Sequence, residues 1–258
     1  MSVLIPEVSR EIIRAASFIR SAKYVVVLSG AGTSTPSGIP DFRSTGSGLW
    51  TRYDPLEYAS LHAFRYNPEN FFEWMRPLAR QIFYADPNPA HSALALLEKN
   101  GYIQIIITQN IDGLHQRAGS QHILEVHGSF QSSTCVSCYQ QFPSDDYFRP
   151  YIETGIIPRC PVCQNILKPD IILIEEQMPF RTWQQAQTAC DKCDLLLITG
   201  SSLEMMPVAG LPARALQHGA RLIIINHSPT YIDVRADILI NADVAEILPK
   251  IAEVVISE

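Results

Sequence analysis

A short, wholly apolar segment that leads directly into a glycine-rich loop constrains the fold of this chain most. Val25 to Leu28 is continuously apolar, a pattern typical of a strand buried on both faces of a parallel sheet. The loop GAGTSTPSGIPDFR follows at once, with glycines at 30, 32 and 38. Small residues let backbone N–H groups approach a phosphate, and open α/β sheets hold nucleotides in loops that follow strands. The spacing differs from G-x-G-x-x-G, but the loop still predicts a nucleotide site.

Three more apolar segments have the same character, and a polar or glycine-containing loop follows each of them. These segments are Ile103–Thr108, Leu195–Thr199 and Leu222–Ile225. Helical spacing of apolar residues predicts helices over about 7–21, 56–85 and 91–99. Alternation of strands and helices favours an α/β fold with a doubly wound parallel sheet. Ligands then bind beyond the carboxyl ends of the strands, where these loops lie.

Charge and composition exclude several classes of function. The 258 residues carry a formal net charge of −6, so no global positive field favours DNA or RNA. The amphipathic N-terminal segment lacks the apolar core of a signal peptide, and no run reaches the roughly 18 apolar residues of a membrane span. We therefore expect a cytoplasmic protein without membrane or direct nucleic-acid contacts. The oligomeric state stays open, with a monomer as the default.

Two C-x-x-C pairs predict a metal site. Cys135 and Cys138 form one pair, Cys160 and Cys163 the other, and the separation between the pairs is typical of tetrahedral zinc. Four thiolates leave no open coordination position, which favours one structural Zn²⁺ over a catalytic one. Free thiols or disulfides are the alternatives, and a reducing compartment disfavours disulfides.

A third C-x-x-C pair, Cys190 and Cys193, has no partner pair. It lies where a helix is expected to end, before the strand at 195–199. Buried, inert thiols are the favoured interpretation, and an exposed redox pair is the alternative.

Polar groups follow the strand that ends at Thr108. Asn110 and Asp112 offer the donors and acceptors that ribose and carboxamide recognition needs, but an Asx-type turn with a helix cap explains them equally well. His127, in the sequence VHG, has an imidazole suited to proton transfer near neutral pH. A lone histidine is more often structural, so its role stays open on this basis.

These motifs, together with KPDIILIEEQMP, GSSLEMMP and IIINHSPT in the same order, resemble those of the sirtuins, the NAD-dependent protein deacylases. The similarity extends from about Ser9 to Ile251, and TPSGIPDFR is similar to bacterial members. The resemblance implies a Rossmann-type NAD-binding domain made of residues 1–43, 86–127 and 169–258. It also implies a smaller domain, with a helical module at 44–85 and a zinc-binding module at 128–168. NAD and an acyl-lysine peptide would enter the cleft between the domains from opposite sides.

The resemblance also implies roles for individual residues. His127 matches the catalytic base, which acts on a ribose hydroxyl after the acyl oxygen has displaced nicotinamide. Asn110 and Asp112 match residues that orient the nicotinamide ribose and carboxamide, and Phe42 would cover the reactive carbon. Together, the residues that match NAD contacts are Gly30, Ala31, Gly32, Thr35, Asp41, Phe42, Arg43, Gln109, Asn110, Ile111, Asp112, His127, Gly200, Ser201, Ser202, Asn226, Asp243 and Val244.

The chain departs from the family pattern in its peptide-binding segment. Ile172, Leu173, Ile174 and Glu175 match that segment, and Ile172 would line the acyl-lysine tunnel. Ile174 and Glu175 replace an aromatic residue and a glycine. Glu175 either favours basic substrate tails or is a solvated surface carboxylate, the blander alternative. Thr33 replaces a common isoleucine, with little expected effect.

The acyl group itself is expected to be neutral. Met75 lies where succinyl-preferring sirtuins have a tyrosine, and Arg76 is two positions short of their arginine and is expected to point elsewhere. An apolar wall leaves a buried carboxylate without a partner. The implied products are nicotinamide and O-acyl-ADP-ribose. Protein mono-ADP-ribosyl transfer and a non-catalytic NAD-binding module are the alternative functions.

Overall fold

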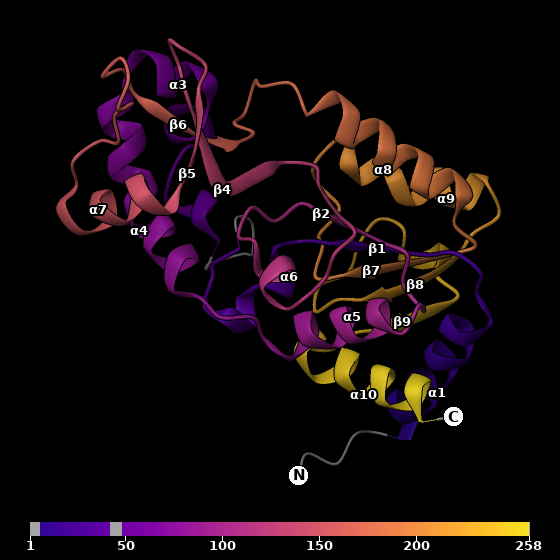
Figure 1. The fold of residues 1–258 in the computed structure, drawn as a ribbon. Coiled ribbons are helices and arrows are strands. Elements are labelled where there is room, and N and C mark those ends of the chain that lie inside the picture. The colour runs from indigo at the N-terminus through magenta and orange to yellow at the C-terminus, as the bar shows by residue number, and fades with distance from the viewer. Residues whose placement is uncertain (1–5, 42–47, 258) are drawn as a thin grey trace.

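A computed structural model describes residues 6–41 and 48–257, and its main sheet has six parallel strands in the order β3-β2-β1-β7-β8-β9 (Figure 1). The strands are β1 (Val25–Ser29), β2 (Ile105–Thr108), β3 (Ile123–Glu125), β7 (Leu195–Thr199), β8 (Arg221–Ile225) and β9 (Ile238–Ile240). This is the strand order of Rossmann folds, with the topological switch point between β1 and β7. The predicted fold class is confirmed.

Helices cover both faces of this sheet. Helices α1 (Pro6–Ser21), α5 (Pro89–Lys99) and α10 (Val244–Ile256) pack on one face, and α8 (Phe180–Lys192) and α9 (Leu211–Gln217) on the other (Figure 1). Within β1, Val25 and Val27 face the first layer and Val26 and Leu28 face the second. All four are fully buried, so the strand is buried on both faces, as the apolar run predicted.

The smaller lobe combines a three-stranded antiparallel sheet with helices. Its strands are β4 (Gly128–Cys135), β5 (Gln141–Pro143) and β6 (Leu167–Ile171), and its helices are α2 (Pro55–Tyr58), α3 (Leu61–Tyr66), α4 (Pro68–Tyr84) and α7 (Asp145–Thr154). The sequence predicted one helical stretch over 56–85, but three helices are present. The chain breaks at Ser60 and Asn67, because their side chains accept the N–H groups of Ala63 and Asn70 and start new helices.

Helix α7 lies within the cysteine-bearing segment but packs on α4. Phe148 and Tyr151 of α7 contact Phe72 of α4 in one aromatic cluster, and the Tyr151 hydroxyl donates to the Phe72 carbonyl. The guanidinium of Arg76 donates to the carbonyls of Ile152 at 3.0 Å and of Glu153 at 2.8 Å, in the last turn of α7. Arg76 therefore points to α7, whereas the sequence predicted only that it does not point into the acyl tunnel. Residues 128–168 contribute to both the cysteine cluster and the helical core.

The remaining elements are short. They are α6 (Leu114–Arg117) and the 3-10 helices η1 (Ala31–Thr33), η2 (Thr35–Ser37), η3 (Leu49–Thr51), η4 (Val208–Gly210) and η5 (Asp233–Arg235). No helix among residues 6–41 and 48–257 has the length and apolarity needed to cross a membrane.

Candidate active site and metal centre

The loops after β1 and β7 interlock through three glycines at the topological switch point. A Cβ atom on Gly30 would lie 2.7 Å from the Gly200 carbonyl oxygen, and one on Gly32 would lie 2.9 Å from the Gly200 Cα. Gly200 itself has φ +58, and a Cβ there would overlap the backbone nitrogen of Thr33. The N–H groups of Gly30 and Gly32 donate to the carbonyls of Thr199 (3.1 Å) and Gly200 (2.8 Å). Close packing between the two loops thus accounts for a glycine at each of these three positions.

Side chains from two strand ends hold the β7 loop in place. Asn226, which is 3% exposed after β8, accepts the Ser201 N–H at 3.0 Å and donates to the Ser201 carbonyl at 2.7 Å. Gln109, after β2, donates to the Ser201 hydroxyl at 2.8 Å. Four predicted NAD contacts, Gln109, Gly200, Ser201 and Asn226, therefore lie together at the carboxyl edge of the sheet.

Asn110, Ser34 and Asp112 form a buried polar cluster beside this edge. The Asn110 amide donates to the Gly30 carbonyl at 3.1 Å and to the Ser34 hydroxyl at 2.9 Å. Ser34 in turn donates to Asp112 Oδ2 at 2.7 Å, while Oδ1 accepts the Leu114 N–H at 2.9 Å. Asp112 therefore makes the turn bond of the plainer interpretation with one oxygen and joins the polar cluster with the other. Burial raises the pKa of its carboxyl, which these two hydrogen bonds and Arg117 oppose.

His127 lies between the loop after β2 and the predicted peptide segment. Its Nδ1 is 3.1 Å from the Gln109 carbonyl, which can only accept, so Nδ1 carries the proton of a neutral ring. The basic lone pair is then on Nε2. The carbonyl of His127 accepts the Ile172 N–H at 2.8 Å. Gly128, at φ +73, permits this approach, because a Cβ there would overlap the Asp170 carbonyl.

The predicted peptide segment is tied to the helical lobe on its other side. Ile174 donates to the Ala59 carbonyl at 3.0 Å and accepts the Leu61 N–H at 2.9 Å. Glu175 is exposed and has φ +73, a conformation that favours glycine and accounts for the family glycine at this position. Its Oε2 accepts the His62 N–H at 3.3 Å. The residue is thus on the surface, as the blander alternative had it, but with its carboxylate bonded to α3.

The four paired cysteines come together as a metal centre. Their Sγ atoms all lie within 4.8 Å of one another, with Cys135 and Cys163 at 3.3 Å and Cys138 and Cys160 at 3.6 Å. A tetrahedral zinc with Zn–S bonds of about 2.3 Å needs sulfurs about 3.8 Å apart. The donor set and its spacing fit one structural zinc without an open position.

The third cysteine pair belongs to the core instead. Cys190 is fully buried and Cys193 is 3% exposed, and both pack under α8 against the main sheet. Burial raises the pKa of both thiols, that of Cys193 to about 12. Both thiols are therefore buried, as the favoured interpretation had it, and the alternative of an exposed redox pair is wrong.

The side chains of the other predicted contacts make interactions of other kinds. Thr35 bonds the Gly32 carbonyl within its own loop, Asp243 caps the N-terminus of α10, and Val244 packs in the core. Ile111 is half-buried against the aromatic core, and Ser202 is exposed. Phe42 and Arg43 lie outside the described residues, and Asp41 precedes them directly.

Sequence reasoning missed three polar residues behind the site: Ser34, His91 and His115. Ser34 stands in the quoted glycine loop, and His115 ends the segment TQNIDGLH that begins at Thr108, so their positions were available as a signal. His91 lies on the apolar face of α5, where a buried helix residue reads as core.

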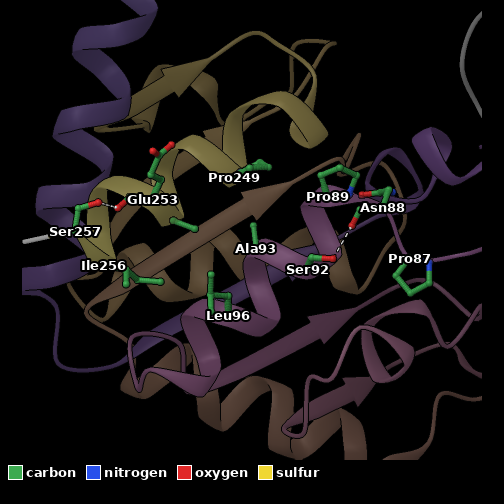
Figure 2. Close-up of a pocket in the computed structure, with 11 residues that line it drawn as sticks. Pro87, Asn88, Pro89, Ser92, Ala93, Leu96, Pro249, Glu253, Ile256 and Ser257 are labelled. Carbon is green, nitrogen blue, oxygen red and sulfur yellow. Dashed lines mark hydrogen bonds between the residues drawn. The ribbon is translucent and has the colours of Figure 1, made fainter.

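A groove of about 690 Å³ lies elsewhere, between α5 and α10 (Figure 2). Apolar side chains such as Ala93, Leu96 and Ile256 form most of its lining. Asn88 at its rim also donates to the Thr33 carbonyl (2.8 Å) and to the Ser37 hydroxyl (3.0 Å), which ties α5 to the glycine loop.

Comparison with known proteins identifies the family. The sequence profile of the Sir2 family matches residues 30–207, so the chain belongs to the Sir2 family. It is 43% identical over 244 residues to NAD-dependent protein deacylase 2 of Archaeoglobus fulgidus, covering 94% of this chain and 95% of that protein.

Two solved structures show the same similarity. A chain solved in work on the structural basis for the mechanism and regulation of Sir2 enzymes superimposes with a TM-score of 0.88 at 42% identity, covering 96% of this chain and 98% of that one. A Sir2 variant with a deacetylated p53 peptide and 3′-O-acetyl ADP-ribose gives a TM-score of 0.86 at 34% identity, with coverage of 95% and 97%.

Proposed function

We propose that this protein is an NAD-dependent protein lysine deacylase, which moves neutral acyl groups, acetyl among them, from lysine to ADP-ribose. The observation that carries the proposal is the placement of His127, whose ring bonds the Gln109 carbonyl and whose own carbonyl bonds the Ile172 N–H. One side chain is thereby fixed between the loop expected to bind NAD and the segment expected to bind the acyl-lysine. Relatives named as NAD-dependent protein deacylases support it.

NAD is consumed in this reaction, so it is a substrate. We assign its phosphates and adenosine to the loops after β1, β7 and β8, and its nicotinamide ribose to Asn110, Asp112 and His127. The buried polar cluster of Asn110, Ser34 and Asp112 supports this assignment, because such groups recognise a ribose or carboxamide by hydrogen bonds. The other proposed contacts are Gly30, Ala31, Gly32, Thr35, Asp41, Phe42, Arg43, Gln109, Ile111, Gly200, Ser201, Ser202, Asn226, Asp243 and Val244.

The proposed chemistry needs positioning more than strong acids or bases. The acyl oxygen attacks the ribose C1′, and nicotinamide leaves as a neutral group from a cationic bond. In the transition state positive charge develops on the ribose, and the buried carboxylate of Asp112 would stabilise it. His127 takes a proton from the ribose hydroxyl through Nε2, so that the hydroxyl can attack the acyl carbon. Exclusion of water favours acyl transfer over NAD hydrolysis.

The acyl-lysine would lie along Ile172, Leu173, Ile174 and Glu175. Ile172 would line an apolar tunnel, and the backbone bonds of Ile174 to the helical lobe hold the segment extended. A tunnel without a cation favours neutral acyl groups, since Arg76 is bonded to α7.

We propose the following organisation around this site. Residues 1–43, 86–127 and 169–258 form the NAD-binding domain, with a helical module at 44–85 and a zinc-binding module at 128–168. The zinc, held by Cys135, Cys138, Cys160 and Cys163, stabilises the small lobe and takes no part in the chemistry. The protein would act on acyl-lysine segments as a cytoplasmic monomer. It would make no nucleic-acid contacts, which the net charge of −6 supports.

The deciding experiment measures nicotinamide release from NAD with and without an acetyl-lysine peptide. Release that depends on the acetylated peptide, with O-acetyl-ADP-ribose as product, is expected. Release with an unacetylated protein and stable ADP-ribosylation of it would favour mono-ADP-ribosyl transfer. Tight NAD binding without any release would favour a non-catalytic NAD-binding module.

A further inference from the structure

Two histidines pack edge to face behind the Asn110, Ser34 and Asp112 cluster. His91 comes from α5 and His115 from α6, and their ring centroids are 4.9 Å apart at an interplanar angle of 66°. Their exposed fractions are 0% and 1%. Burial lowers the pKa of His91 to about 4, and burial together with the neighbouring His91 lowers that of His115 to about 3. Both rings are therefore neutral near pH 7, with one N–H donor each.

The backbone decides which nitrogen of His91 carries the proton. The N–H of Asn88 points at His91 Nδ1 at 3.3 Å, and an N–H can only donate. Nδ1 must therefore be the acceptor, so the proton is on Nε2. Nε2 lies 3.5 Å from the Ser34 hydroxyl oxygen and is its donor.

This fixes the direction of the hydrogen bonds around Ser34. Its oxygen accepts from His91 and, at 2.9 Å, from the Asn110 amide, which occupies both lone pairs. The single proton of Ser34 then goes to Asp112 Oδ2, at 2.7 Å. The other oxygen, Oδ1, accepts the Leu114 N–H. Both oxygens of Asp112 thus face donors, so a proton added to either oxygen would have no acceptor among these partners, and the arrangement favours the ionised carboxylate.

His115, the other ring of the pair, also donates its hydrogen bond through Nε2. Ser29 donates to the Thr108 hydroxyl at 2.9 Å, so the contact of 2.9 Å between His115 Nε2 and Ser29 makes Nε2 the donor. Nδ1 of His115 has no hydrogen-bond partner in the described part of the chain, as suits a nitrogen without a proton. Thr108 also accepts the Asn110 N–H at 3.0 Å. His91 therefore contacts Asp112 through Ser34. His115 contacts Thr108, where the loop that holds Asn110 and Asp112 begins, through Ser29.

We propose that His91 and His115 are positioning residues. The His91 ring directs the Ser34 hydroxyl toward Asp112, which favours the ionised carboxylate, and the His115 ring directs the Ser29 hydroxyl toward Thr108, whose hydroxyl accepts the Asn110 N–H. The proposal rests on the proposed function only in giving Asp112 a catalytic use. Its physical core is a statement about the protein without substrates. Each histidine works here as a hydrogen-bond donor of fixed direction, because burial lowers the pKa of both rings well below neutrality.

The groups that face Asp112 set the sign of the effect. Burial raises its pKa, while the Leu114 N–H, Ser34 and the charge of Arg117 lower it. Glu125 lies close enough that the charge of Asp112 raises the pKa of Glu125, which burial also raises. Removal of the His91 donor lets the Ser34 proton turn away from Asp112, so the pKa of Asp112 rises further. The active, ionised form then disappears at a higher pH as the solution is acidified.

The test measures the titration of Asp112 directly in the substrate-free protein. ¹³C-labelled carboxyl resonances are followed by NMR from pH 4 to 8, with Asp112→Asn to assign the signal. His91→Phe keeps a ring against His115 but removes the donor, so the midpoint of the Asp112 titration should rise by about one pH unit or more. His91→Gln, which restores an N–H donor, should return it most of the way. His218→Gln, at the exposed end of α9, is the control and should not move it.

A kinetic experiment follows from the same shift. The acidic limb of kcat/KM for NAD should move to higher pH in His91→Phe and in Ser34→Ala, so that activity near pH 6 falls at least tenfold more than activity at pH 8. An Asp112 midpoint that is the same in His91→Phe and the wild type would overturn the proposal. If His91→Phe does not fold, Ser34→Ala and Ser29→Ala take its place, and an unshifted midpoint in Ser34→Ala would also overturn it. Failure of the deacylase assay in the wild type would leave the NMR result standing, so the two hypotheses fail separately.

Discussion

The backbone N–H of Ile172 donates a hydrogen bond of 2.8 Å to the carbonyl oxygen of His127. This bond joins the residue expected to act as the base to the segment expected to hold the acyl-lysine. The two groups meet because Gly128 lets β4 cross close to the backbone of Asp170. A histidine that the sequence alone could not distinguish from a structural one thereby lies beside the proposed reaction.

Replacement of His127 tests the proposed base. His127→Ala should lower turnover on the order of 10²–10⁴-fold, because general base catalysis typically contributes that much. Steady-state deacylation measures the loss, and calorimetric NAD binding shows whether the pocket survives. His218→Ala is a matched surface control, expected to retain wild-type turnover. A folded His127→Ala protein that binds NAD and turns over at the wild-type rate would refute the assignment.

The metal centre is tested by cysteine substitution. Cys160→Ser should lose zinc and unfold the small lobe, because metal-binding free energy is part of its folding free energy. Cys190→Ser, in the buried pair under α8, should retain one zinc per chain. Elemental analysis and near-UV circular dichroism measure both effects. Zinc that is retained in Cys160→Ser, or lost in Cys190→Ser, would contradict the assignment.

Acyl choice is tested on one peptide carrying different acyl groups. Turnover should fall about 100-fold or more from acetyl-lysine to succinyl-lysine, since an unpaired buried carboxylate costs several kcal/mol. Arg76 will not rescue it, because its guanidinium is bonded to the carbonyls of Ile152 and Glu153. Equal turnover on both peptides would show that some cation reaches the tunnel. Arg76→Ala would then identify whether it is this one.

The interlocked loops are tested by a pair of glycine substitutions. Gly200 and Gly219 both have positive φ, at +58 and +90, so alanine suffers backbone strain of about 1–2 kcal/mol at either position. Only at Gly200 does the new Cβ also overlap a neighbouring backbone, whereas nothing lies within 4 Å at Gly219. Gly200→Ala should therefore lower the free energy of unfolding at least twice as much as Gly219→Ala. Urea denaturation measures both, and equal losses would mean that the loops separate easily.

The sequence predicted the parts of the fold that have a local signal. The strand Leu195–Thr199 was predicted with the bounds that the structure has, because a run of four apolar residues is a strong local pattern. β3 and β9 are three residues each, too short for a period to show, and their places at the two sheet edges depend on pairing with distant strands. The cysteine cluster was predicted from spacing alone, since two knuckles carry their geometry in four residues each.

The deeper polar part of the site could not be predicted in the same way. Ser34 contacts His91 and Asp112 across 57 and 78 residues of sequence, and His115 contacts Ser29 across 86. No period or local spacing encodes such contacts. They depend on the strand order, which brings the ends of β1 and β2 together.

Helix α7 is covalently part of the cysteine-bearing segment, yet its side chains complete the aromatic core of α4 and its last carbonyls bind Arg76. We therefore expect residues 48–85 and residues 128–168, which leave the main sheet at separate points of the chain, to unfold as one cooperative unit. A chelator acting on the sulfur cluster would then also expose Phe72, which lies far along the chain from the four cysteines. Any hinge between the two lobes would accordingly lie in the chain segments that join them, because neither of these two parts of the small lobe can move without the other.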